Sequence, residues 1–138
     1  MITLLTGISS SAAALTAERI RMEVISQNIA NANTTRGLDG KPYQRQHVVF
    51  ETALRQQQGG AGSFGSPQAV QVSRIESDNR PPRLIPDPSN PGAMQAVPDV
   101  NIHEEMADYI TASRSFEANL AVVKNARAMA MQTLTIGK

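Results

Sequence analysis

The sequence contains no cysteine and no tryptophan, and its aromatic side chains are few. Because there is no thiol, disulfide frameworks, thiolate zinc sites and cysteine nucleophiles are excluded. Only three Phe and two Tyr occur among 138 residues, so the 41% of hydrophobic residues are mostly small and aliphatic. Aromatic side chains normally supply much of the buried area of a compact domain. Their scarcity favours apolar residues that form an interface over residues that fill one globular core.

The chain also lacks an excess of charge of either sign. Lys and Arg number 13 against 12 Asp and Glu, which gives a formal net charge of +1. This balance argues against non-specific binding to nucleic acid or anionic membranes, because such binding needs a concentrated positive field. The composition also argues against a disordered tail, and the length predicts one folded unit.

Proline and glycine are almost confined to the middle of the chain. All eight Pro lie within residues 42–98, and seven of the nine Gly lie within residues 37–92. Residues 8–36 and 99–136 contain neither helix breaker, so each segment predicts a long helix.

We therefore expect a mainly α protein with a small β and loop insert. The predicted parts are an N-terminal helix within residues 1–36, the insert over residues 37–98 and a C-terminal helix within residues 99–138. The two helices are expected to pack as an antiparallel, coiled-coil-like hairpin. In the insert, residues 43–51 and 70–75 read as strands, joined by a flexible stretch over 56–63, and residues 80–98 read as an extended arm.

Apolar side chains recur along both predicted helices at the spacing of a helix–helix seam. In the first helix they stand seven residues apart, with one residue beside them: Ile8, Leu15, Met22, Ile29 and Ile25. In the second they follow steps of four and three: Ile102, Met106, Tyr109, Phe116, Leu120, Val123 and Leu134. These residues are the expected interface between the helices and with other chains, although a self-contained bundle has the same spacing.

The predicted length of the C-terminal helix favours an assembly subunit. Such a helix would be about 55 Å long, whereas a compact protein of this size has a radius of gyration of about 14 Å. One of Ser9, Ser10 and Ser11 is the expected cap of the first helix, and Asn101 that of the second.

No segment carries a convincing catalytic or metal-binding pattern. The run His103–Ala107 begins like a zinc-protease helix but lacks the second His, and Glu104 and Glu105 point to different helix faces. We expect both glutamates to be solvated carboxylates that complement the helix dipole. The first 17 residues carry no charged side chain, but no basic residue precedes their interrupted apolar run, which argues against a cleaved signal peptide.

Several runs, over about the first 50 and last 40 residues, resemble the axial proteins of the bacterial flagellum, namely the rod, hook and hook-associated proteins. The centre of the family motif is an Asn-Ile-Ala-Asn-x-x-Thr run, whose members here are Asn28, Ile29, Ala30, Asn31, Asn33 and Thr34. The other matching runs are Gly7–Ala12, Leu15–Met22, Pro42–Phe50, Val100–Ile102, Ala112–Asn119 and Thr133–Lys138. Residues 94–99 depart from the family, which often has a Gly-Tyr-Val run there.

The resemblance implies a non-enzymatic subunit of the proximal rod, the drive shaft that crosses the periplasm. It implies export without cleavage through the flagellar type III apparatus and helical assembly that transmits torque. The implied partners are further copies, other proximal and distal rod proteins and a rod-to-basal-ring adaptor, with no cofactor, metal, nucleic acid or small-molecule substrate. Two alternatives stay open, namely another axial protein of the rod and hook family and a self-contained helical adaptor.

The resemblance and the pattern together assign roles to two groups of residues. Asn28, Asn31 and Asn33 are expected to end the first helix and fix the direction in which the chain leaves it. Residues at the start of the insert are expected to contact the next subunit or an outer ring: Tyr43, Arg45, Val48 and Phe50.

Overall fold

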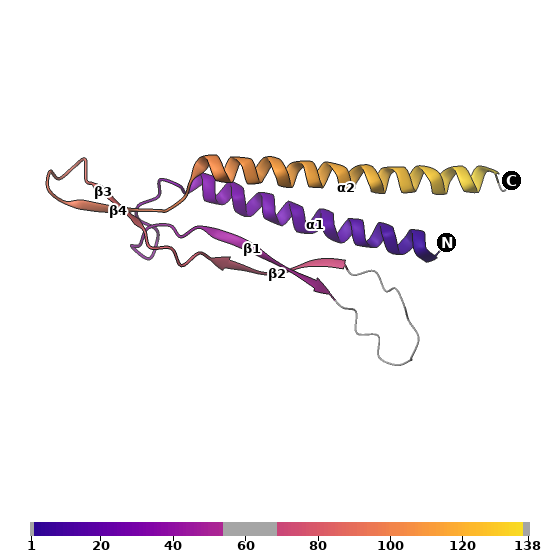
Figure 1. Ribbon diagram of the computed structural model, residues 1–138, viewed down its shortest axis with the longest axis horizontal. Helices are drawn as coiled ribbons and strands as arrows, with labels where there is room; N and C mark the ends of the chain where they lie inside the picture. Colours follow the sequence, from indigo (N-terminus) through magenta and orange to yellow (C-terminus); the bar gives the residue numbers. More distant parts are fainter. Residues whose placement is uncertain (1, 54–68, 137–138) are drawn as a thin grey trace, which may run out of the picture.

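Two long helices, α1 (Ile2–Ala30) and α2 (Ile102–Ile136), lie side by side and antiparallel, with both chain ends at one end of an elongated molecule (Figure 1). The computed structural model describes residues 2–53 and 69–136. Between the helices in sequence come two antiparallel hairpins, β1 (Gln46–Ala53) with β2 (Ala69–Ser77) and β3 (Arg83–Pro86) with β4 (Met94–Val97). The predicted mainly α fold with a small β insert is confirmed.

Helix α1 lies between two other layers. Helix α2 packs along one side of it, and the β1–β2 hairpin contacts another side (Figure 1). The strand register shifts between Val49 and Phe50, whose partners are Arg74 and Val72, so a β-bulge adds one residue, Ser73, to β2. A bulge increases the local twist of a hairpin, which helps it to follow a neighbouring helix.

The strands predicted over residues 43–51 and 70–75 are confirmed as β1 and β2, whereas the predicted flexible stretch over 56–63 lies outside the described residues. The arm predicted over residues 80–98 was wrong in part, since it contains β3 and β4. Strands of four residues are too short to show alternation. The prolines around them favoured an unpaired, extended segment instead.

The turn between β3 and β4 explains how a proline-rich segment forms a hairpin. The Asp87 N–H donates to the Ala93 carbonyl at 2.9 Å, and Asp87 Oδ1 accepts from the Ser89 N–H at 2.8 Å. Gly92 has a φ of 98°, a conformation that side chains with a Cβ rarely adopt. Local hydrogen bonds and one glycine therefore close the turn.

The predicted N-terminal cap is confirmed for α2 and was wrong for α1. Asn101 Oδ1 accepts from the His103 N–H at 3.1 Å, which confirms Asn101 as the cap of α2. Helix α1 begins at Ile2, so residues 9–11 lie inside it and the cap expected among them was wrong. Serine tolerates a helix interior when tertiary packing stabilises the helix.

Two alanines and one glutamate form the line that α2 buries. On α2 the buried residues are Glu105, Ala112 and Ala126, which stand at multiples of seven. On α1 and the turn after it the buried residues are Ala17, Val24, Ile25, Asn28 and Ala32. Alanine at such positions lets two helix backbones approach closely, which leaves larger side chains beside the line rather than in it. Among the described residues, no helix is both long and apolar enough to cross a membrane.

Candidate functional site

A buried polar junction joins the end of α1, the start of α2 and the start of β1. Its members are Asn28 on α1, Glu105 on α2, and Tyr43, Arg45 and Gln46 at the entry to β1. Asn28 and Glu105 are each 1% exposed, which makes them the two buried polar residues among those described. Buried polar groups are costly unless they are hydrogen-bonded, so the geometry of this junction decides what it contributes.

Asn28 uses its complete hydrogen-bonding capacity. Its Nδ2 donates to the Gln46 carbonyl at 2.8 Å and to Glu105 Oε2 at 2.9 Å. Its Oδ1 accepts from the Tyr43 hydroxyl and from the Gln46 N–H, both at 2.9 Å. Two donors and two acceptors are therefore all satisfied, and one side chain links three segments of the chain.

The Glu105 carboxylate is compensated by Arg45. Arg45 Nε donates to Glu105 Oε1 at 2.5 Å, and its terminal nitrogens lie 3.9 Å from Asp78 and 3.8 Å from Asp108. The Arg45 carbonyl also accepts from the Asp78 N–H at 2.7 Å. A buried carboxylate with a charged donor on one oxygen and an amide on the other is a satisfied group, and it fixes the relative positions of α1, α2 and β1.

The turn after α1 completes the connection. Asn31 Nδ2 donates to the Gln27 carbonyl at 2.9 Å, and Asn31 Oδ1 accepts from the Thr34 hydroxyl at 3.2 Å. The Thr34 carbonyl then accepts from the Tyr43 N–H at 3.1 Å. These bonds close the helix and return the chain toward α1, so that Tyr43 reaches Asn28.

The environment of Tyr43 gives a pH-dependent prediction. Burial, and secondarily the negative charge of Glu105, raise the pKa of Tyr43 above its ordinary value of 10.0. The folded chain then keeps this proton at pH values at which the unfolded chain has lost it. The stabilisation is therefore complete below about pH 10 and is lost as the pH rises through the higher, folded-state pKa.

The test uses the Tyr109→Phe variant, in which Tyr43 is the remaining tyrosine of the two in the sequence. We expect its phenolate absorbance to titrate at higher pH in the folded chain than in the same variant in urea. Equal midpoints in the two states would show that the hydroxyl is not held in the junction.

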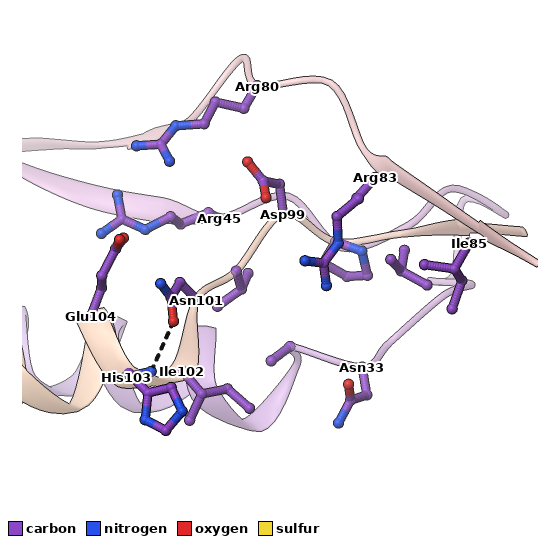
Figure 2. Close-up of a pocket in the computed structure, with 14 residues that line it drawn as sticks. Asn33, Arg45, Arg80, Arg83, Ile85, Asp99, Asn101, Ile102, His103 and Glu104 are labelled. Carbon is purple, nitrogen blue, oxygen red and sulfur yellow. Dashed lines mark hydrogen bonds between the residues drawn. The ribbon is translucent and has the colours of Figure 1, made fainter.

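An open cavity of about 510 Å³ adjoins the junction at the start of α2. Figure 2 shows Arg45, Arg80 and Arg83 on one side of it and the capped first turn of α2, with Asn101 and His103, on the other. Asp99 and Glu104 also line the cavity. Within the described ranges 2–53 and 69–136, no group of three or more His, Asp or Glu side chains is placed to hold a metal ion.

The structure places the residues of the predicted helix–helix interface in three environments. Ile25 is buried at 5% exposure. Half-buried side chains are those of Ile8, Leu15, Met22, Ile29, Phe116, Leu120 and Val123. Exposed side chains are those of Ile102, Met106, Tyr109 and Leu134. Much of the predicted stripe on α2 is therefore left uncovered by α1.

The exposed residues at the start of α2 form a continuous patch. Ile102, Met106, Tyr109 and Ile110 are 38%, 52%, 42% and 51% exposed. Their spacing of four, seven and eight residues from Ile102 puts them on one side of the helix. We call these four residues the α2 apolar face.

The motif and insert residues divide between the junction and the surface. In the motif, Asn28 is buried, Ile29, Asn31 and Thr34 are half-buried, and Ala30 and Asn33 are exposed. Of the insert residues, Tyr43 and Arg45 bind within the junction, Val48 is half-buried and Phe50 is 36% exposed.

Sequence reasoning missed the role of Glu105. The expectation of a solvated carboxylate was wrong, because Glu105 is 1% exposed and bonded to Asn28 and Arg45. One signal was present: Glu105 stands seven residues before Ala112, on the line that α2 buries. Its partners are far away in sequence, and a single sequence carries no sign of that pairing.

Comparison with known proteins identifies the family. A family model described as flagella basal body rod protein matches residues 8–36, and one for the C-terminal region of flagellar basal body rod FlgEFG proteins matches residues 93–136. The flagellar basal-body rod protein FlgC of Borreliella burgdorferi is 37% identical, with 96% of this chain and 97% of that protein covered.

Two further relatives agree with this match. FlgC of Bacillus subtilis is also 37% identical, with the same coverage of 96% and 97%. FlgC of Salmonella typhimurium is 33% identical over 91% of each chain. These relatives are structural proteins of the rod, so the protein is structural and not an enzyme. The chain belongs to the FlgC family of flagellar basal-body rod proteins.

Proposed function

We propose that this rod protein is a subunit of the proximal rod that assembles helically and transmits torque. The observation that carries the proposal is the α2 apolar face, which the chain does not cover itself. At 1.5 Å per residue, the 35 residues of α2 extend about 52 Å, more than the diameter of a compact protein of this length. An elongated subunit with an uncovered apolar face gains stability by packing against neighbours.

The polar junction supports the torque-bearing part of the proposal. It ties both helices to the β1–β2 hairpin through hydrogen bonds to Asn28 and Glu105, so a force on one element passes to the others. The proposed neighbours are further copies, other proximal and distal rod proteins and the rod-to-basal-ring adaptor. Phe50, exposed on β1 opposite the bulge of β2, is the insert residue best placed for such a contact.

The proposed route to the rod is export through the flagellar type III apparatus without a cleaved signal peptide. The absence of cysteine supports it, because no disulfide has to be broken before the chain is threaded unfolded. The proposed location is the part of the rod that crosses the periplasm, and the proposed rod-core segments are residues 1–36 and 99–138, with the insert over 37–98 facing outward.

A charge placed on the α2 apolar face tests the proposal. We expect Met106→Asp to abolish motility and basal-body assembly when it replaces the wild-type gene, because the charge is buried at a subunit contact. The free energy of unfolding of the isolated chain should change by less than about 1 kcal/mol, since Met106 is already 52% exposed.

The matched control is Asn125→Asp, which places the same charge at an exposed position elsewhere on α2. Motility and electron microscopy of basal bodies are the measurements, beside a strain in which the gene is deleted. Normal rods in the Met106→Asp strain would contradict the assignment of the α2 apolar face to a contact between subunits. Normal motility in the deletion strain would contradict the proposed function itself.

A further inference from the structure

The bulge at Ser73 divides the β1–β2 hairpin into two halves. In the basal half, residues 46–49 pair with residues 74–77, and in the distal half, residues 50–53 pair with residues 69–72. Strand β1 runs from the junction toward the end of the molecule that holds the chain termini (Figure 1). The two halves therefore lie along different parts of α1, and only the basal half is next to the junction.

The basal half is attached to both helices by hydrogen bonds. Both peptide groups of Gln46 bond the Asn28 side chain on α1, at 2.8 and 2.9 Å. Arg45, the residue before β1, donates to Glu105 on α2. The Arg45 carbonyl accepts from the N–H of Asp78, the residue after β2, at 2.7 Å. Both strands are therefore tied to the junction at the base of the hairpin.

The distal half rests on α1 without such bonds. Within the described parts of the chain, no hydrogen bond or ion pair joins it to residues 13–24 of α1, and the Thr16 hydroxyl donates to the Ala12 carbonyl of its own helix. An open groove of about 440 Å³ separates Val70 and Val72 from a mostly small-residue side of α1, formed by Ala13, Thr16, Ala17 and Ile20. Val70 is 41% exposed, so only part of its side chain is covered. Few contacts therefore hold the distal half against the helix.

The bulge provides a place at which the hairpin can bend. Ser73 has no partner in the ladder, so the strand pairing is already interrupted between the two halves. The distal half can change its angle to α1 there without breaking the pairs of the basal half. Segments with few buried contacts open at a much lower free energy than the whole fold, which makes the distal half the part of the hairpin that opens first.

We propose that the distal half of the β1–β2 hairpin is a flap that opens away from α1 about the bulge, while the basal half stays attached to the junction. Opening exposes the side of α1 that carries Ala13 and Ala17. The pairing of α1 with α2 is left intact, because α2 packs along a different side of α1 (Figure 1). The opening is a property of the isolated chain and does not depend on the proposed role in the rod.

Two cysteine probes test the flap, because the chain has no native cysteine. Ala17 lines the groove beneath the distal half, and Val24 lines a cavity with Val48 of the basal half; they are 3% and 4% exposed. We expect a maleimide to react about tenfold faster with Ala17→Cys than with Val24→Cys, after each rate is divided by its rate in denaturing urea. Dilute urea should accelerate only the Val24→Cys reaction, which requires global unfolding. If Ala17→Cys does not fold, Ala13→Cys provides the same probe of the groove.

Deletion of Ser73 tests the bulge as the hinge. The deletion makes the ladder regular and keeps every pair of both halves. We expect it to slow the reaction of Ala17→Cys about fivefold and to leave that of Val24→Cys unchanged. Equal rates at the two positions in the chain that retains Ser73 would overturn the flap, because the hairpin would then leave α1 as one unit. An Ala17→Cys rate that the deletion does not change would overturn the bulge as its hinge.

Discussion

Replacing Asn28 by Ala is expected to lower the free energy of unfolding of the isolated chain by about 3 kcal/mol. The substitution leaves the Tyr43 hydroxyl, both peptide groups of Gln46 and one oxygen of Glu105 without their partner. Each unsatisfied buried group costs about 1–3 kcal/mol, partly relieved where water can enter. The better helix propensity of Ala recovers only about 0.5 kcal/mol.

Urea denaturation followed by circular dichroism measures this loss. The matched control is Asn33→Ala, five residues later in the same motif, where the side chain is exposed. We expect this control to change the free energy of unfolding by about 0.5 kcal/mol or less. Equal effects of the two substitutions would contradict the role of Asn28 as the centre of the junction.

Placing a charge at Ala112 is expected to separate the two helices. Ala112 is 0% exposed on the line along which α2 packs against α1, and its methyl group leaves no room for a solvated carboxylate. We expect Ala112→Asp to lower the free energy of unfolding by about 3 kcal/mol or more, because the charge is buried without a partner.

The control for this prediction is Ala121→Asp, which introduces the same side chain at an exposed position nine residues further along α2. Thermal or urea unfolding of both variants gives the comparison. If Ala112→Asp were as stable as Ala121→Asp, the helices would not be held together along the line of small residues that the structure shows.

The two helices were predictable because a long segment without proline or glycine has few alternatives to a continuous helix. The sequence predicted β1 from the apolar run Val48–Phe50, and β2 from the alternation that begins at Val70 and Val72. It did not predict which side of α2 is buried, because apolar size indicated Met106 and Leu134 whereas close helix packing selected Ala112 and Ala126. The preference for small residues depends on the distance between the two helix backbones. The hydrophobic period of a sequence does not indicate that distance.

The polar junction was the least predictable part of the protein. Asn28 and Glu105 are 77 positions apart in sequence, and the bond between them exists only because the helices are antiparallel and in one register. The motif residues were recognised as a helix end, which holds for Asn31 and its bond to Thr34. The additional role of Asn28, which links α1 to β1 and α2, could be recognised only in the folded structure.

The accessibility of residue 106 in the isolated chain and in the rod tests the central claim most directly. A Met106→Cys chain that restores motility is labelled with a maleimide, first as purified protein and then in isolated basal bodies. We predict rapid labelling of the purified chain, since Met106 is 52% exposed, and strong protection in basal bodies. Equal labelling rates in the two preparations would contradict the claim that neighbouring subunits cover the α2 apolar face.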